Sequence, residues 1–237
     1  MSEVTPNNKK ESFKLFDEIA GTYDLLNILL SFGIDRLWRK KVRRIVEERP
    51  VKNALDMATG TGDMAILLAK SPSVQDIVGI DLSKEMISIG NQKIKDSQLS
   101  QKANLIIGDG VNIPYDNDSK DLITITFGIR NFGDYKKSID NMYKVLRPGG
   151  RAIIMEFSLP KNPIIKHVYL LYFRYILPFF GKIISKHKTA YSYLNQTVEK
   201  FPYGKKFADN FYESGFSKVD IHPLTFGIAS IYVAYKD

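Results

Sequence analysis

The feature that most constrains this chain is an alternation of short, almost wholly apolar runs with longer amphipathic runs between residues 53 and 157. Short apolar runs of this kind are typical of buried strands, and the longer runs carry their apolar residues at helical spacing. Strands that alternate with helices form a mostly parallel sheet with helices on both faces. The sequence therefore predicts an α/β fold, and for a chain of 237 residues a single domain is expected.

The alternation places each expected element. Strands are expected at residues 53–58, 76–81, 103–109, 121–127 and 151–157, with a closing pair at 218–223 and 228–235. Helices are expected at 63–70, 83–95 and 207–215. A further helix should end at a Pro-Gly-Gly stop, and its apolar residues at helical spacing are Ile139, Met142, Tyr143 and Leu146. Within the single domain of residues 1–237, residues 1–50 are expected to form a helical cap and residues 158–206 a helical insertion that forms a substrate lid.

The stretch LDMATGTGD, residues 55–63, puts a glycine turn between the first expected strand and its helix. Gly60 and Gly62 fit the pattern GxGxxG/A, and Asp81 lies about 20 residues further on, where a ribose-binding acid is expected. Glycines let the backbone approach a ligand, and a helix amino terminus offers free N–H groups. These properties suit NAD and S-adenosylmethionine (SAM) alike. The loops after residues 58, 81, 109 and 127 should line one cleft at the carboxyl ends of the strands.

Two further acids favour SAM over NAD. Asp56 precedes Gly60 by four residues, where a carboxylate would repel a pyrophosphate but attract the ammonium and sulfonium of SAM. Asp109 follows the third expected strand, where it can accept a hydrogen bond from an adenine amino group, and Gly110 leaves room for the ring. The alternative for Asp109 is a side chain that only caps a turn. Together with Asp81, these acids favour a methyltransferase, and an NAD-dependent oxidoreductase is the alternative of another class.

Composition narrows the remaining classes of function. The chain has no cysteine and three scattered histidines, so no metal site is expected. Residues 1–12 are polar and lack the apolar core of a signal peptide, which predicts a cytoplasmic protein. A net charge of +8 favours nucleic acid or anionic lipid as a neighbour, unless it serves solubility alone. No RNA-binding module is recognisable, which disfavours a nucleic-acid partner.

An aromatic, apolar segment at residues 168–184 is interrupted by charges, proline and glycine, and it is too short for a membrane span. Basic residues surround it. A second basic region, near residue 38, is expected to be a helix with Trp38, Val42, Ile45 and Val46 on one face and Arg39, Lys40, Arg43 and Arg44 largely on the others. These features favour peripheral association with the inner face of the cytoplasmic membrane, or a lid over a greasy ligand. Packing of the segment on the sheet and a homodimer through the same surface are the alternatives.

Four stretches resemble one family, the ubiquinone/menaquinone biosynthesis C-methyltransferases. They are YDLLNILLSFGIDRLW (23–38), FGIRN (127–131), KVLRPGGRAIIMEFS (144–158) and YFRYILPFFGKIISK (172–186). The last is more similar to the menaquinone branch, and the resemblance spans nearly all of residues 12–236. Two positions depart from the pattern: Asp35 stands where the family usually has histidine, and Lys144 where it usually has arginine.

The resemblance implies a class I SAM-dependent methyltransferase, which is Rossmann-like, with a mostly parallel seven-stranded sheet and an antiparallel last strand. It implies methylation of a ring carbon of demethylmenaquinol, a substrate with a long polyprenyl tail, in menaquinone biosynthesis. A ubiquinone precursor, 2-polyprenyl-6-methoxy-1,4-benzoquinol, is the alternative substrate.

The resemblance also carries over the cofactor contacts. These are Thr61, between Gly60 and Gly62, Asp81 at the ribose hydroxyls, and Asp109 with Gly110 at the adenine. Thr126, at the end of the fourth strand, is an additional candidate.

Three residues are candidate contacts of the substrate ring by the same resemblance: Arg130, Asn131 and Tyr23. Loosening a phenolic proton raises electron density at the adjacent ring carbon, so a polarising group near that hydroxyl assists methylation. Because a guanidinium is ordinarily fully protonated, Arg130 is expected to stabilise a phenolate rather than act as a base. The alternatives are a surface ion pair for Arg130 and a core-packing role for Tyr23.

Overall fold

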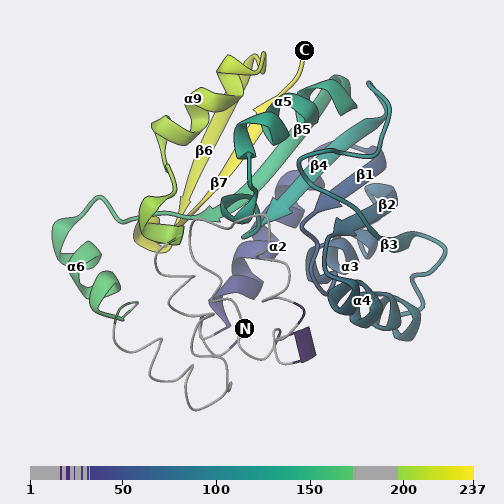
Figure 1. The fold of residues 1–237 in the computed structure, drawn as a ribbon, viewed down its shortest axis with the longest axis horizontal. Coiled ribbons are helices and arrows are strands. Elements are labelled where there is room, and N and C mark those ends of the chain that lie inside the picture. Colours follow the sequence, from purple (N-terminus) through teal and green to yellow (C-terminus); the bar gives the residue numbers. More distant parts are fainter. Residues whose placement is uncertain are drawn as a thin grey trace.

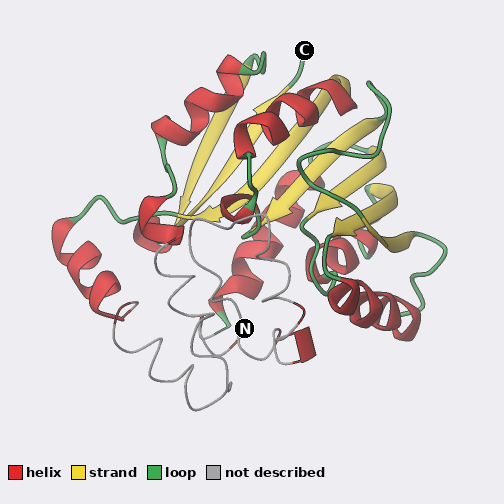
Figure 2. Ribbon diagram, in the orientation of Figure 1, coloured by secondary structure: helices red, strands yellow, loops and turns green. Residues whose placement is uncertain are grey.

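The computed structural model describes residues 33–172 and 197–237, together with Asp17, Ala20, Gly21, Asp24, Ile28, Ser31 and Arg174. Within these residues seven strands form one twisted sheet with helices packed on it (Figures 1 and 2). The strands are β1 (Val51–Met57), β2 (Val74–Asp81), β3 (Ala103–Ile107), β4 (Lys120–Thr126), β5 (Leu146–Phe157), β6 (Lys218–Leu224) and β7 (Ala229–Tyr235).

The strand order is β3-β2-β1-β4-β5-β7-β6. Parallel ladders join β1 to β2 and β4, β2 to β3, and β4 to β5, whereas β7 runs antiparallel to both β5 and β6. The predicted sheet of seven mostly parallel strands with an antiparallel last strand is confirmed. Because the chain leaves β1 towards β3 and returns to β4 on the other side of β1, the order reverses between β1 and β4. Ligands of open α/β sheets bind at the carboxyl ends of the strands at such a switch point.

Helices cover both faces of the sheet. The helices and short 3-10 turns are α2 (Ile34–Val46), α3 (Asp63–Ala69), α4 (Lys84–Asp96), η2 (Ile129–Asn131), α5 (Tyr135–Val145), α6 (Pro163–Leu171), α9 (Lys205–Glu213) and η4 (Thr225–Gly227). Apolar side chains of α2, α3 and α4 share one core with the sheet, and those of α5 and α9 share the other. Neighbouring β1 residues alternate between the two cores, Ala54 facing the first and Leu55 the second. This two-sided burial explains why the strands are nearly continuous apolar runs.

Local sequence explains where two of the helices begin. Ser83 caps α4, and its hydroxyl accepts a hydrogen bond from the backbone N–H of Met86 at 3.1 Å. Asp134 caps α5 in the same way, accepting from the N–H of Lys137 at 3.0 Å. Each such cap contributes about 1 kcal/mol. The helix expected from residue 83 therefore begins at its serine cap.

The end predicted for the helix before the Pro-Gly-Gly sequence is wrong. That helix, α5, ends at Val145, and Leu146 is the first residue of β5 rather than part of the helix. The Pro-Gly-Gly sequence consequently lies inside β5, where the pairing with β4 shifts register between Lys120 and Leu122. Gly149 has φ 78°, a backbone angle that favours glycine. Glycines in a strand often mark such an irregularity, which the sequence pattern could not distinguish from a loop.

In helix α2 the predicted apolar face is confirmed, whereas the predicted outward position of Arg39 is wrong. Trp38, Val42, Ile45 and Val46 are buried, as expected. Arg39, which the sequence predicts among the outward basic residues, is also buried, with 9% of its surface exposed. Its charge is accommodated by an ion pair one helical turn away, with Asp35.

Candidate active site

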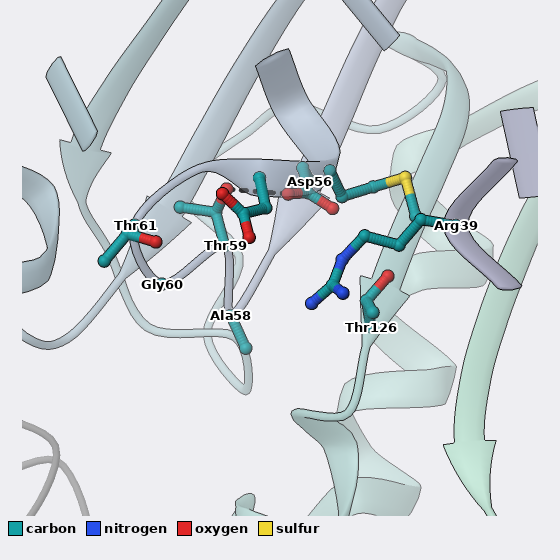
Figure 3. A pocket seen from close by; sticks show the side chains of 9 residues that line it. Arg39, Asp56, Ala58, Thr59, Gly60, Thr61 and Thr126 are labelled. Atoms are coloured by element: carbon teal, nitrogen blue, oxygen red, sulfur yellow. Dashed lines mark hydrogen bonds between the residues drawn. The ribbon is translucent and has the colours of Figure 1, made fainter. Parts of the chain in front are cut away.

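A pocket lies at the switch point, at the carboxyl ends of β1 and β4 (Figure 3). The glycine turn forms one wall, and the end of β4 and a side chain from α2 form the rest. The lining residues are Arg39, Asp56, Ala58, Thr59, Gly60, Thr61, Asp63, Met64 and Thr126. The predicted cofactor residues Gly60 and Thr61 thus border one pocket with Asp56, as the sequence suggested.

The glycine turn adopts backbone angles that favour glycine. Gly60 has φ 55° and Gly62 has φ 80°. At Gly62, an added Cβ would also come within 2.9 Å of the side chain of Leu105. Ala58 is left-handed too, with φ 50°, although it carries a side chain. Such residues cost on the order of 1–3 kcal/mol and are frequent at ligand sites.

Asp56 is the buried acid of the pocket. Its two carboxylate oxygens accept hydrogen bonds from the hydroxyls of Thr59 and Thr124, each at 2.6 Å. Burial raises the pKa of Asp56 to about 6, against the opposing effects of the two hydroxyls and of Arg39. A ligand cation beside this carboxylate would favour its ionised form. Thr124, on the neighbouring strand, was missed by sequence reasoning because only the pairing of β1 with β4 brings it to Asp56.

Asp81 ties the end of β2 to the glycine turn. Its carboxylate accepts from the backbone N–H of Gly60 at 2.9 Å and from that of Ser83 at 3.0 Å. Burial raises the pKa of Asp81, and these backbone hydrogen bonds work against the rise. A carboxylate has about four acceptor positions, so Asp81 keeps acceptor capacity for a ribose hydroxyl. The structure therefore fixes Asp81 in a position compatible with its predicted role.

Asp109 and Gly110 lie after β3 and do not line this pocket. Asp109 accepts from the backbone N–H of Val111 at 2.8 Å and from the side-chain amide of Asn112 at 2.7 Å, so it does cap a turn. An added Cβ at Gly110 would lie 2.4 Å from the ring of Phe132, so that ring fills the room which the glycine leaves. Phe132, which sequence reasoning missed, thus packs directly against Gly110. The contact of Asp109 with adenine stays a prediction.

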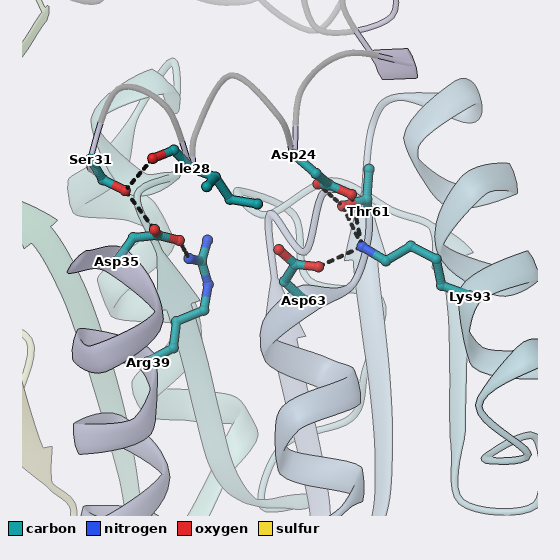
Figure 4. Close-up of polar contacts among 8 residues, drawn as sticks. All are labelled: Asp24, Ile28, Ser31, Asp35, Arg39, Thr61, Asp63 and Lys93. Atoms are coloured by element: carbon teal, nitrogen blue, oxygen red, sulfur yellow. Dashed lines mark hydrogen bonds and ion pairs between the residues drawn. The ribbon is translucent and has the colours of Figure 1, made fainter. Parts of the chain in front are cut away.

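The amino-terminal residues that the structure describes reach the cofactor loops (Figure 4). Asp24 accepts from the hydroxyl of Thr61 at 2.6 Å and pairs with Lys93 of α4 at 2.9 Å. Lys93 also pairs with Asp63 and donates to the Thr61 hydroxyl at 3.1 Å. Burial works to lower the pKa of Lys93, but the two neighbouring carboxylates outweigh it and raise that pKa. Thr61 is therefore held by charged partners on two sides.

Arg130 is buried, with 5% of its surface exposed, at the 3-10 turn that follows β4. Its Nη1 pairs with a carboxylate oxygen of Glu156 at 2.7 Å and also donates to the carbonyl of Phe127. The guanidinium lies over the ring of Phe157, 5.3 Å from its centroid. The predicted alternative of a surface ion pair is therefore wrong, because this ion pair is buried.

Asn131 and Tyr23 are the other two predicted contacts of the substrate ring. Within the described part of the chain, the Nε of Arg130 and the Oδ1 of Asn131 are buried and have no hydrogen-bond partner. Tyr23 lies outside the described residues. Glu156, at the end of β5, was missed because it is 26 residues from Arg130, and only the β4–β5 pairing brings the two together.

Two stacked phenylalanines lie between Arg39 and Arg130. The rings of Phe127 and Phe157 have centroids 4.3 Å apart, and the guanidinium of Arg39 is 6.0 Å from the centroid of Phe127. Phe127 has φ 59°, which is unusual for a residue with a large side chain. The site therefore has a polar part, around Asp56 and Arg39, and an aromatic part, around Arg130.

Comparison with known proteins assigns the chain to a family. Residues 4–236 match the model of the ubiE/COQ5 methyltransferase family. The chain is 43% identical over 237 residues, 100% of both chains, to the ubiquinone/menaquinone biosynthesis C-methyltransferase UbiE of Geotalea daltonii. It is 39% identical over 223 residues, 94% of this chain and 91% of the relative, to a demethylmenaquinone methyltransferase of Bacteroides fragilis.

Solved structures show the same fold at lower identity. A SAM-dependent methyltransferase of Thermotoga maritima matches with a TM-score of 0.65 and 14% identity, over 95% of this chain and 99% of that chain. A phosphoethanolamine N-methyltransferase of Haemonchus contortus, solved with S-adenosyl-L-methionine, matches with a TM-score of 0.59 and 14% identity, over 79% of this chain and 49% of that chain. The protein therefore belongs to the ubiE/COQ5 methyltransferase family and is a SAM-dependent methyltransferase, and the alternative of an NAD-dependent oxidoreductase is not supported.

Proposed function

We propose that the protein methylates a ring carbon of demethylmenaquinol to give menaquinol. The observation that carries this proposal is the 39% identity, over 94% of the chain, to a relative named demethylmenaquinone methyltransferase. The buried arginine beside two aromatic rings supports it, because such a surface suits a flat, oxygen-bearing ring. The methoxy-benzoquinol of the ubiquinone branch is the second candidate, and it is favoured by the dual name of the Geotalea relative.

The pocket fits the polar end of SAM. Asp56 supplies a buried carboxylate for the methionine ammonium, and Gly60 and Thr61 line the same pocket. Gly62, the next residue of the turn, is the N-cap of α3. Asp81 would hold the ribose, and Asp109 with Gly110 the adenine. When bound there, SAM supplies an electrophilic methyl group on a positively charged sulfur. The chain's contribution is to hold this group in a fixed position and to exclude water from it.

On the substrate side, Arg130 is the group that would stabilise negative charge on the quinol oxygen. The substrate hydroxyl would release its proton to water, and the resulting phenolate would raise electron density at the neighbouring ring carbon. That carbon would form the new bond to the methyl group as the methyl–sulfur bond breaks and S-adenosylhomocysteine leaves. It would then release its own proton to water, so that the ring regains aromaticity. A guanidinium has five N–H donors, and the Nε of Arg130 has no hydrogen-bond partner among the described residues. Glu156 is the positioning residue that fixes the guanidinium.

Asn131 and Tyr23 complete the proposed substrate contacts. The side-chain oxygen of Asn131 is buried and has no hydrogen-bond partner in the described part of the chain, so it could accept from the second quinol hydroxyl. Tyr23 is proposed to contact the same ring, as the family resemblance implies.

We also propose that the protein binds the membrane surface in which its polyprenyl substrate is dissolved. No helix among the described residues is both long and apolar enough to cross a membrane. Three apolar side chains of α6, Ile164, Val168 and Leu171, are exposed and share one face of the helix at i, i+4 and i+7 spacing. An apolar helix face of this kind, in a chain with net charge +8, is suited to the interface of an anionic membrane. The rest of the aromatic segment at 168–184 lies mainly outside the described residues.

The function is tested by an assay with SAM and a reduced demethylmenaquinone that carries a short isoprenoid tail. We expect the product mass to rise by one methyl group in place of one ring hydrogen. Methylation of only the methoxy-benzoquinol would assign the protein to the ubiquinone branch, and no methylation of either ring would contradict the proposal.

Sedimentation with anionic and neutral vesicles at low salt tests the proposed membrane binding. Absence of binding to the anionic vesicles would contradict it.

A further inference from the structure

One buried cation in the pocket comes from outside the glycine turn. Arg39 belongs to α2, yet its guanidinium points into the pocket that Asp56 and Thr126 also line (Figure 3). One nitrogen, Nη1, pairs with Asp35 on the preceding turn of the helix. Its Nε is buried and, in the described part of the chain, has no hydrogen-bond partner. Burying a donor without a partner is unfavourable, so such an atom beside a pocket indicates a missing acceptor.

The second observation is that the cation and the anion of the pocket are not paired with each other. Both oxygens of Asp56 accept from threonine hydroxyls, and the nearest carboxylate to Arg39 is Asp35. The Arg39 charge nevertheless lowers the pKa of Asp56, after the larger effects of burial and the two hydroxyls, so the two groups share one electrostatic environment. A pocket with a separate buried cation and anion is complementary to a zwitterion.

We propose that Arg39 binds the α-carboxylate of the methionine part of SAM while Asp56 attracts its α-ammonium. A carboxylate is the acceptor that matches a guanidinium, because two parallel N–H groups can donate to its two oxygens. The buried hydroxyl of Thr126, which has no hydrogen-bond partner among the residues described, lies beside Arg39 and can donate to the same carboxylate. The inference depends on the use of SAM but not on the identity of the quinol.

Asp35 acts as the positioning residue for this cation (Figure 4). It accepts from the hydroxyl of Ser31 at 2.6 Å and pairs with Arg39 across one helical turn. The pair occupies Nη1 and directs the remaining donors of the guanidinium towards the pocket. Asp35 is also the position at which this chain departs from the usual histidine of the family pattern, so a carboxyl group here stands in place of an imidazole.

The test compares ligands that differ only in the carboxylate. Calorimetry measures the affinities of S-adenosylhomocysteine, its decarboxylated analogue and 5′-methylthioadenosine, which lacks the whole amino-acid end. For the unchanged protein we expect S-adenosylhomocysteine to bind about 10- to 100-fold more tightly than the decarboxylated analogue. In Arg39→Met this preference should disappear, while the affinities for the other two ligands stay unchanged. Binding of those two ligands also reports that the variant is folded.

Two further variants keep the result decisive. Arg36→Met, on the exposed face of the same helix, should leave all three affinities unchanged. If Arg39→Met does not fold because Asp35 is left buried without its partner, the double variant Asp35→Asn/Arg39→Met removes both charges, and the same loss of preference is expected. An equal fall in affinity for all three ligands, or an unchanged preference for S-adenosylhomocysteine in a folded variant, would overturn the proposal.

Discussion

The two buried arginines of the site, Arg39 and Arg130, resemble each other in their pairing and differ in their surroundings. Each pairs with one carboxylate, and each has a buried Nε that lacks a hydrogen-bond partner within the described residues. Arg39 borders the polar pocket that contains Asp56, whereas Arg130 lies over the ring of Phe157. We propose that the same type of side chain serves two ends of the reaction, with Arg39 at the cofactor and Arg130 at the quinol.

Loss of Arg130 should have the largest effect of the changes that test this division. Arg130→Ala removes the charge that we propose for the quinol oxygen, so turnover should fall by about 100- to 1,000-fold. The affinity for S-adenosylhomocysteine should stay within twofold, because Arg130 does not line the cofactor pocket. Steady-state rates and calorimetry on one preparation check both parts. Near-normal turnover would remove Arg130 from the proposed mechanism.

Glu156→Gln tests whether Arg130 depends on its partner. Glu156 is 1% exposed, and breaking a buried ion pair by removing one partner typically costs about 3–5 kcal/mol of the free energy of unfolding. We expect a smaller loss of stability than this, because the amide can still accept from Nη1, together with a fall in kcat and little change in KM for SAM. Denaturant unfolding and steady-state kinetics measure the two effects. A loss of stability with unchanged kcat would assign Glu156 a structural role alone.

Asp56 gives a prediction for pH, since burial raises its pKa to about 6. Below that pH the carboxyl is protonated and no longer attracts the methionine ammonium, so cofactor affinity should fall by about 10-fold between pH 8 and pH 5. A raised pKa in the folded state also means a stability contribution that is fully present below the unfolded value of 3.8 and is lost as the pH rises through about 6. Asp56→Asn should therefore abolish the pH dependence of binding and raise the melting temperature at pH 8. Calorimetry and thermal melts across this range check both results.

The smallest effect is expected at Lys93, whose ion pairs are partly exposed. Its side chain is 30% exposed, and those of Asp24 and Asp63 are 36% and 41% exposed. Exposed pairs contribute about 0.2–1 kcal/mol, so Lys93→Met should lower the free energy of unfolding by less than about 1 kcal/mol. A salt titration of the unfolding midpoint gives the measurement, and the difference between variant and parent should shrink at high salt. A loss of several kcal/mol would show that this cluster organises more of the fold than its exposure indicates.

The two arginines also show how far a sequence can be interpreted on its own. The α/β class depends on local spacing, and this prediction is confirmed, as is the seven-stranded sheet that the family resemblance implies. Gly60 and Thr61 of the glycine turn line the pocket, and their contact with the cofactor stays a prediction. Burial of Arg39 was not predicted, although Asp35 stands one helical turn before it, because basic residues surround it in the sequence and suggest an exposed face. The Arg130–Glu156 and Asp56–Thr124 contacts depend on the pairing of strands that are far apart in sequence, so no local pattern contains them.

The local sequence also does not predict the conformations of certain single residues. The ring of Phe132 over Gly110 and the left-handed backbone of Phe127 follow from the packing of the turn after β4, and residue type alone predicts neither. The irregular start of β5 has a similar cause, because the register of β4 decides where the strand begins.

The division between the two arginines is tested most directly by titrating S-adenosylhomocysteine into Arg39→Met and Arg130→Ala under identical conditions. We expect Arg39→Met to weaken binding by about 10- to 100-fold and Arg130→Ala to leave it within twofold of the parent. Equal affinities in the two variants, or weaker binding in Arg130→Ala than in Arg39→Met, would contradict the assignment of Arg39 to the cofactor and Arg130 to the quinol.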